Sequence, residues 1–197
     1  MNEINNILTI DVEEYYHAEN ILRSVPEDKI RSLPDRVGVG VNKILDLLEK
    51  TGNKATFFVL GCVAQKNRDL IKKIAAGGHE IASHGYFHIP LTMHTPESFD
   101  EDLGRSVKIL SDITGQKILG YRATSFSLRE NMAWFFDVLR KHGITYDSSI
   151  AKSLFRTTCN LQEGKCDIGH FEISKGITEF PVSHIKVGPI SLPMGGG

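Results

Sequence analysis

Residues 78–88 read Gly-His-Glu-Ile-Ala-Ser-His-Gly-Tyr-Phe-His, a strand-like run that leads into two histidines four positions apart. We expect a short strand over His79–Ser83, with His84 and His88 following where that strand ends. Two neutral imidazoles and one carboxylate form a common open Zn²⁺ site, which leaves a coordination position for water. Taken alone, the pair also fits two partly exposed loop histidines. A metal site therefore needs a carboxylate from another part of the chain.

Short strand patterns alternate with helical patterns along the rest of the chain. Strands are predicted over Ile7–Ile10, Ala55–Leu60, Ile118–Tyr121 and Ile144–Asp147, and less regular strand-like pieces occur near Ile177–Val182 and Ile185–Leu192. Helices are predicted over Val37–Leu48, 65–76, 96–114 and Asn131–Lys141. Repeated strand–helix units indicate parallel strands with crossover helices, so the fold class is α/β. The pattern fits both a barrel and an open doubly wound sheet, and both place functional groups at the carboxyl ends of strands.

The helix that follows Thr95 has the clearest boundaries. The Thr95 side chain can cap its first turn, and Pro96 suits the first helical position. Gly115 follows the last apolar residue of the helical stripe and is typical of a helix end. By the same reasoning, Gly52 ends the helix predicted near Val37–Leu48.

Acidic residues stand where the first predicted strand ends, at Asp11-Val12-Glu13-Glu14. In an extended segment Asp11 and Glu13 point the same way, because side chains repeat every two residues. One of them could bind a metal while the other, held just outside, acts as a base. The alternative is a solvated acidic loop after a strand.

Two further strand ends carry ionisable side chains. Arg122 follows the strand at 118–121, and a guanidinium can hold a carboxylate through two hydrogen bonds and fix its orientation. The alternative for Arg122 is a surface ion pair. Asp147 could support the site from behind or cap the turn with Ser148 and Ser149, and the residues themselves favour the cap.

Composition limits the remaining choices. The chain has 197 residues with 23 Lys and Arg against 24 Asp and Glu, a length that suits one domain. A formal net charge of -1 gives no general attraction to nucleic acid or an anionic membrane, and three cysteines cannot form a disulfide framework within the chain. Neither a signal peptide nor a transmembrane segment is evident in the sequence, so we expect a cytoplasmic protein.

These motifs, in this order, resemble the polysaccharide deacetylases of carbohydrate esterase family four, the NodB-homology family. The segments that carry the resemblance are 8–13, 55–61, 78–88, 120–123 and 146–149. The fit is closest to the branch associated with bacterial exopolysaccharide and exosortase loci. The resemblance implies a distorted, incomplete (β/α) barrel of the NodB deacetylase type. It also implies a single domain over 1–197 that lacks its C-terminal part, because relatives continue past the glycine run at 195–197.

The resemblance assigns a role to each matching residue. Asp11 matches the catalytic base and Arg122 the arginine that orients it, while His84 and His88 match the metal histidines. Val12 replaces the usual metal-binding aspartate, so Glu13 is the expected carboxylate ligand and Glu14 the second option. The expected ion is a divalent metal, with Zn²⁺ as first choice. Thr124 stands where the family has a proline, a departure that affects the shape of this loop.

The remaining parts of the family mechanism fit less completely. Backbone N–H groups near Ser125 are expected to stabilise the oxyanion. The family takes its general acid from a histidine in a late motif, and no residue of this chain matches it convincingly. His17 lies near the first motif and is predicted to be a structural or sugar-contacting residue.

The predicted function is a metal-dependent hydrolase that removes N-acetyl groups from hexosamine residues of a bacterial polysaccharide or its precursor. The expected partner is an N-acetylated glycan, with no nucleic acid, and the sequence carries no signal for an oligomeric state. One alternative is a non-catalytic carbohydrate-binding fragment. Another is a hydrolase of a small amide or ureide.

Overall fold

The computed structural model describes residues 7–151, 169–187 and 190–193. Within these residues, seven strands form one sheet in the order β1-β2-β3-β4-β5-β7-β6. The strands are β1 Thr9–Val12, β2 Thr56–Val59, β3 Glu80–Ser83, β4 Gly120–Tyr121, β5 Tyr146–Asp147, β6 Phe171–Ser174 and β7 Ile177–Glu179. All neighbours are parallel except β6 and β7, which pair antiparallel. The predicted α/β class with a parallel sheet is therefore confirmed.

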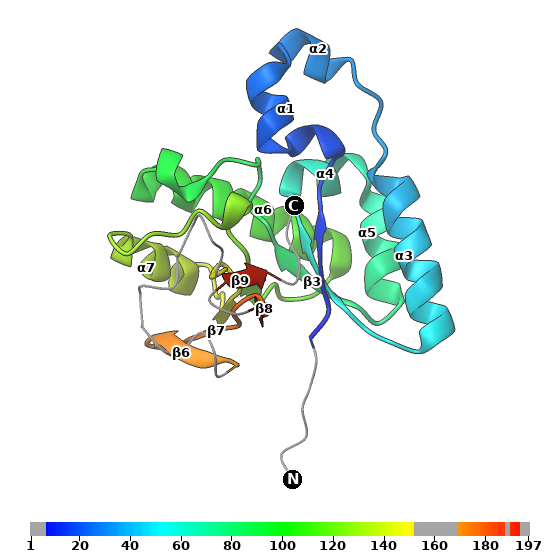
Figure 1. Cartoon of the computed structure of the whole chain (residues 1–197). Coiled ribbons are helices and arrows are strands. Elements are labelled where there is room, and N and C mark those ends of the chain that lie inside the picture. The colour runs from blue at the N-terminus through cyan, green and yellow to red at the C-terminus, as the bar shows by residue number, and fades with distance from the viewer. Residues whose placement is uncertain (1–6, 152–168, 188–189, 194–197) are drawn as a thin grey trace.

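The helices connect successive strands and cover the sheet. They are α1 Glu19–Ser24, α2 Glu27–Arg31, α3 Val37–Thr51, α4 Gly61–Lys66, α5 Arg68–Ala76, α6 Pro96–Thr114 and α7 Ala133–Lys141, with short 3₁₀ turns η1 Tyr15–His17, η2 Leu91–Met93 and η3 Thr124–Phe126. Figure 1 shows α3 and α5 side by side on one flank of the sheet, while α1 and α2 lie beyond the far end of β1. The carboxyl end of β1 therefore faces the short helices α1 and α2.

The three helix ends predicted from sequence have the expected geometry. The Thr95 side chain accepts a hydrogen bond from the backbone N–H of Ser98 at 3.2 Å, which caps α6. Gly115 and Gly52 follow α6 and α3 with φ of 70° and 67°, a left-handed conformation that glycine adopts without strain.

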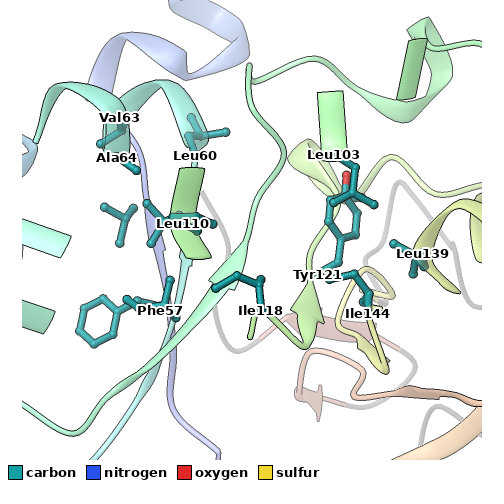
Figure 2. Close-up of a cluster of buried hydrophobic side chains, with 14 of the residues drawn as sticks. Phe57, Leu60, Val63, Ala64, Leu103, Leu110, Ile118, Tyr121, Leu139 and Ile144 are labelled. Atoms are coloured by element: carbon teal, nitrogen blue, oxygen red, sulfur yellow. The ribbon is translucent and has the colours of Figure 1, made fainter. Parts of the chain in front are cut away.

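The core lies between the sheet and helices on both of its faces. The residues of β2 are all buried, which identifies it as an interior strand covered on both faces. Figure 2 shows part of this core, with Phe57 of β2 near Leu110 of α6. Close packing also explains Gly120 of β4, because a Cβ atom there would lie 2.0 Å from Cζ of Tyr146.

Several predicted boundaries were wrong. The helix expected at 65–76 is two helices, because Asn67 leaves helical geometry and bonds its side chain to the Val63 carbonyl at 3.0 Å. The strand expected at 185–192 is a hairpin of β8 His184–Val187 and β9 Ile190–Pro193. The sequence patterns did not predict the short helices α1 and α2 or the strand β6.

The sheet is open. Among the described residues, β1 and β6 are its two edge strands and do not pair with each other. This arrangement confirms the incomplete (β/α) barrel that the resemblance implied. No helix within the described ranges has the length and apolar character to cross a membrane.

Candidate active site

The predicted site residues converge at the carboxyl ends of three strands. Asp11 lies in β1 and Glu13 follows it, while His84 comes directly after β3 and Arg122 directly after β4. Parallel pairing in register places Asp11 next to Phe58, and Ser83 next to Tyr121. Because the strands are parallel, their ends meet at one edge of the sheet and bring the predicted residues together.

Glu13, His84 and His88 form a compact cluster. Each offers one ligand-type atom, and these atoms all lie within 4.8 Å of one another. The Glu13 carboxylate oxygen Oε2 lies 3.0 Å from Nε2 of His88, and the ring centroids of His84 and His88 are 5.6 Å apart. The side chains of His84 and His88 are largely buried, so the cluster is mostly shielded from solvent.

His84 is held as a neutral imidazole in one orientation. Its Nδ1 lies 2.8 Å from the backbone carbonyl of Arg122 and donates a hydrogen bond to that oxygen, which leaves the Nε2 lone pair free. Burial lowers the pKa of His84 below its ordinary value. A neutral ring fixed by a carbonyl on one nitrogen is the form that binds a metal through the other.

The cluster fits a divalent metal ion. The Glu13 oxygen Oε2 is buried, yet no well-aligned hydrogen-bond donor reaches it from the described residues. Burial raises the pKa of Glu13, but the nearby rings of His88 and His84 outweigh this effect, and the net pKa is lowered. An ionised carboxylate beside two imidazoles is the donor set of an open three-ligand zinc site.

Asp102 of α6 holds the loop between the two histidines. Its carboxylate accepts hydrogen bonds from the backbone N–H groups of Tyr86 at 2.7 Å and Phe87 at 3.1 Å. Gly85 has φ of 81°, and a Cβ atom there would lie 2.9 Å from the Asp102 carboxylate. The loop therefore follows a path that only glycine allows, and α6 fixes that path from behind.

Arg122 holds Asp11 in place. The guanidinium NH1 donates to Asp11 Oδ1 at 2.8 Å, while NH2 donates to Thr9 Oγ1 at 2.9 Å and to Ser148 Oγ at 2.8 Å. The third nitrogen, Nε, donates to the Ser148 carbonyl at 3.0 Å, and the Phe58 ring covers one face at 4.2 Å. The Asp11 side chain is 23% exposed, so the bound carboxylate still faces solvent.

The η3 turn after Arg122 has unusual backbone geometry. Ser125 and Phe126 have φ of 53° and 46°, which is uncommon for residues with side chains and is frequent at functional sites. Thr124, where the resemblance expects proline, is buried and donates its hydroxyl to the Ile89 carbonyl at 2.8 Å. This hydrogen bond ties the turn to the segment after His88.

His17 lies against the metal cluster. Its ring stacks parallel to that of His88, with centroids 6.1 Å apart, and its Nδ1 accepts the backbone N–H of Glu14 at 3.2 Å. Burial, followed by the charge of His88, lowers the pKa of His17 to about 4. His17 is therefore neutral at neutral pH.

Two acidic residues take roles other than those first considered. Glu14 is not part of the metal cluster, because its buried carboxylate accepts the backbone N–H groups of Arg36 and Val37 where α3 begins. The preference for Asp147 as a turn cap was incomplete. Asp147 is fully buried, accepts the Ser149 hydroxyl at 2.5 Å and lies against Glu179. Glu179 was not among the site residues predicted from the sequence.

Comparison with known proteins places the chain in a family. The profile of the polysaccharide deacetylase family matches residues 35–146, which is more than half of the chain and includes His84, His88 and Arg122. The chain belongs to the polysaccharide deacetylase family. The resemblance noted from the motifs is therefore confirmed. Asp11 and Glu13 lie before the matched range, so their assignment depends on the geometry described above.

Three relatives illustrate the extent of the match to this deacetylase family. A peptidoglycan deacetylase of Helicobacter pylori is 33% identical over 119 residues, 59% of this chain and 39% of that protein. A peptidoglycan-N-acetylglucosamine deacetylase of Bacillus cereus is 37% identical over 73 residues, 37% of this chain and 26% of that protein. A Mycobacterium smegmatis structure described as a polysaccharide deacetylase superposes with a TM-score of 0.67 and 26% identity, covering 90% of this chain and 58% of the other. The chain thus spans less than half the length of these two curated relatives and just over half of the solved structure.

Proposed function

We propose that this chain is a metal-dependent N-deacetylase that acts on hexosamine residues of a bacterial polysaccharide or its precursor. The observation that carries the proposal is one edge of the sheet, where the Asp11–Arg122 ion pair adjoins the Glu13–His84–His88 cluster. A base with fixed orientation beside a three-ligand metal site is the arrangement that amide hydrolysis by an activated water requires.

Glu13, His84 and His88 would hold the ion. When bound, a divalent metal such as Zn²⁺ supplies Lewis acidity, which makes water more acidic and polarises a carbonyl oxygen. The carbonyl of Arg122 orients His84, and the backbone bonds to Asp102 orient the loop to His88. These contacts prepare the two histidine ligands before any ion binds, and so reduce the cost of ordering them.

Asp11 takes the role of general base. Its Oδ1 is occupied by Arg122, and the other carboxylate oxygen has no hydrogen-bond partner among the described residues, so it can accept a proton from the attacking water. The water oxygen bonds to the acetamide carbon, the C–N bond breaks, and the products are acetate and the free amine. Arg122 keeps its positive charge beside the base throughout.

The turn at Ser125 is the proposed site for the developing oxyanion. This turn follows Arg122 closely in the chain, and the N–H of its left-handed residue Ser125 is the group that would stabilise the negative charge. The general acid stays unassigned. A histidine acts as general acid in its protonated imidazolium form, whereas His17 is a neutral imidazole at neutral pH. We propose that His17 contacts the sugar.

The substrate class follows from the relatives. Two of them are named for deacetylation of peptidoglycan, and we infer an N-acetylated glycan for this chain as well. The exopolysaccharide branch of the family, suggested by the motifs, makes an N-acetylhexosamine exopolysaccharide the more specific proposal.

Acetate release tests the proposal. Protein loaded with one equivalent of Zn²⁺ should release acetate from at least one of N-acetylglucosamine oligomers, peptidoglycan fragments and an N-acetylated exopolysaccharide. The Asp11→Asn variant should retain the metal and lose about 100- to 10,000-fold in rate, because it removes the general base. Asp112→Asn, on the exposed part of α6, is the matched control and should behave as wild type.

Two results would sink the proposal. One is a metal-loaded protein that binds glycans but releases no acetate, with the same affinity after His84→Ala, as a carbohydrate-binding fragment would behave. The other is hydrolysis of a small amide or ureide alone, with no activity on any glycan of the panel.

A further inference from the structure

A pair of buried acids lies behind Arg122 and has no part in the chemistry proposed so far. Asp147 ends β5 and Glu179 ends β7, and the two residues pair directly across these parallel strands. Both side chains have no exposed surface. The sequence places them in separate segments, and only the sheet brings them together.

The two carboxyl groups require a proton between them. Asp147 Oδ2 and Glu179 Oε2 are both buried, and no conventional donor among the described residues reaches either oxygen. The other oxygen of each group is occupied, since Asp147 Oδ1 accepts the Ser149 hydroxyl and Glu179 Oε1 accepts the Ile150 N–H at 2.9 Å. Two adjacent buried anions would repel each other at high cost, whereas one proton converts the contact into an O–H···O hydrogen bond.

The pair is connected to Arg122 by two serines. Ser149, which donates to Asp147, also accepts the backbone N–H of Ala123 at 2.8 Å, next to Arg122. Ser148 accepts Arg122 through both its hydroxyl and its carbonyl, and it donates its hydroxyl to the Phe180 carbonyl at 2.8 Å. The guanidinium is thus held by Ser148, the residue after Asp147, while Ser149 ties the Asp147 carboxylate to the backbone beside Arg122.

We propose that Asp147 and Glu179 hold one shared proton and act together as positioning residues for Arg122. The proton lies on Glu179, which donates to the Asp147 carboxylate, so the pair carries a single negative charge. This inference rests on the proposed function, because Arg122 matters here as the residue that orients the base. It adds Glu179, a residue from a different strand, to the parts that the reaction needs.

The charges around the pair agree with this arrangement. Burial raises the pKa of Asp147 to about 6, and burial followed by the negative charge of Asp147 raises the pKa of Glu179 well above its ordinary value. Arg122 is the cation that faces both acids, and Tyr121 is the other titratable group affected by Asp147. Opposite Glu179 on β6 stands the apolar Phe171.

Substitutions of Glu179 test the proposal. Glu179→Gln can accept from Ile150 and donate to Asp147 without a titrating proton, so it should keep a kcat close to wild type. Glu179→Ala leaves Oδ2 of Asp147 without its partner acid and should lower kcat about 10- to 100-fold with little change in KM or metal content, as displaced positioning groups do. Glu172→Gln, on the exposed side of the same hairpin, is the matched control.

Two spectroscopic measurements apply even if no acetate is released, and so separate this inference from the proposed function. Wild type and Glu172→Gln should show the infrared C=O band of a buried protonated carboxyl at neutral pH, and Glu179→Gln should lack it. The Arg122 Nε–H resonance should shift in Glu179→Ala and return in Glu179→Gln. Absence of the band in wild type, or an Arg122 resonance unchanged in Glu179→Ala, would overturn the proposal.

Where Glu179→Ala does not fold, Asp147→Asn supplies the comparison, because its amide can donate to a Glu179 carboxylate. It should keep the Arg122 resonance and lose the infrared band. A retained band would contradict the shared proton.

Discussion

At the scale of single residues, neighbours in the acidic segment after β1 have sharply different surroundings. Asp11 contacts a guanidinium, Glu13 contacts an imidazole, and Glu14 contacts backbone N–H groups where α3 begins. Alternation along an extended chain accounts for Asp11 and Glu13 sharing one side. The turn into η1 then sends Glu14 away from the site.

Paired substitutions of Glu13 and Glu14 should separate metal binding from stability. Glu13→Gln should lose stoichiometric metal binding because it removes the anionic ligand, with little change in the free energy of unfolding of the metal-free protein. Glu14→Ala should keep one metal per chain and lose about 1–3 kcal/mol of stability, because buried donors at the start of α3 lose a charged acceptor. Metal analysis and chemical denaturation measure the two effects. The assignment is wrong if Glu14→Ala loses the metal and Glu13→Gln does not.

At the scale of elements, α6 does more than cover the sheet. Its Asp102 reaches the loop between β3 and η2, so the position of a surface-facing loop depends on the packing of a long helix. The helix itself packs against α4 and α7, with Leu103 and Leu110 fully buried. The loop that carries the proposed ligand His88 is thus anchored to a helix that packs in the core.

Removal of the Asp102 carboxylate should therefore weaken the metal site from a distance. Asp102→Ala should lower metal affinity about 10- to 100-fold, as losses of supporting contacts behind metal ligands do, whereas Asp102→Asn retains an acceptor and should lose less. Competition with a chelator of known affinity measures the difference. Equal affinity in wild type and Asp102→Ala would show that the loop holds its shape without α6.

At the scale of the whole molecule, the buried acid pair makes stability depend on pH. Burial raises the pKa of Asp147 in the folded state from 3.8 to about 6, and burial with the negative charge of Asp147 raises the pKa of Glu179 well above its ordinary value. A raised carboxyl pKa gives stability that is present in full below the unfolded value and is lost as pH rises through the folded value. The thermal unfolding midpoint of wild type should therefore fall relative to that of Glu179→Gln as pH rises from about 4. A difference that stays constant with pH would contradict this linkage.

The sequence predicted the parts of the molecule that depend on local pattern. The caps of α3 and α6, the central strands and the residues at their ends follow from periodicity and from glycine, proline and threonine at element boundaries. The break at Asn67, the pairing of Asp147 with Glu179 and the use of Glu14 as a cap depend on tertiary contacts. Buried acidic residues give no signal in the sequence, because nothing local distinguishes them from exposed ones.

The contacts of Arg122 also determine when the site can form during folding. Its bond to Asp11 joins residues 111 apart in the chain, and its bond to Thr9 joins residues 113 apart. Contacts of such long sequence separation form late, because the chain must first lose the entropy of closing a large loop. Strand β1 must therefore join β4 and β5 in the sheet before Arg122 can hold Asp11. A partly folded chain can carry His84 and His88 without the Asp11–Arg122 ion pair beside them, so the proposed base would be oriented only late in assembly.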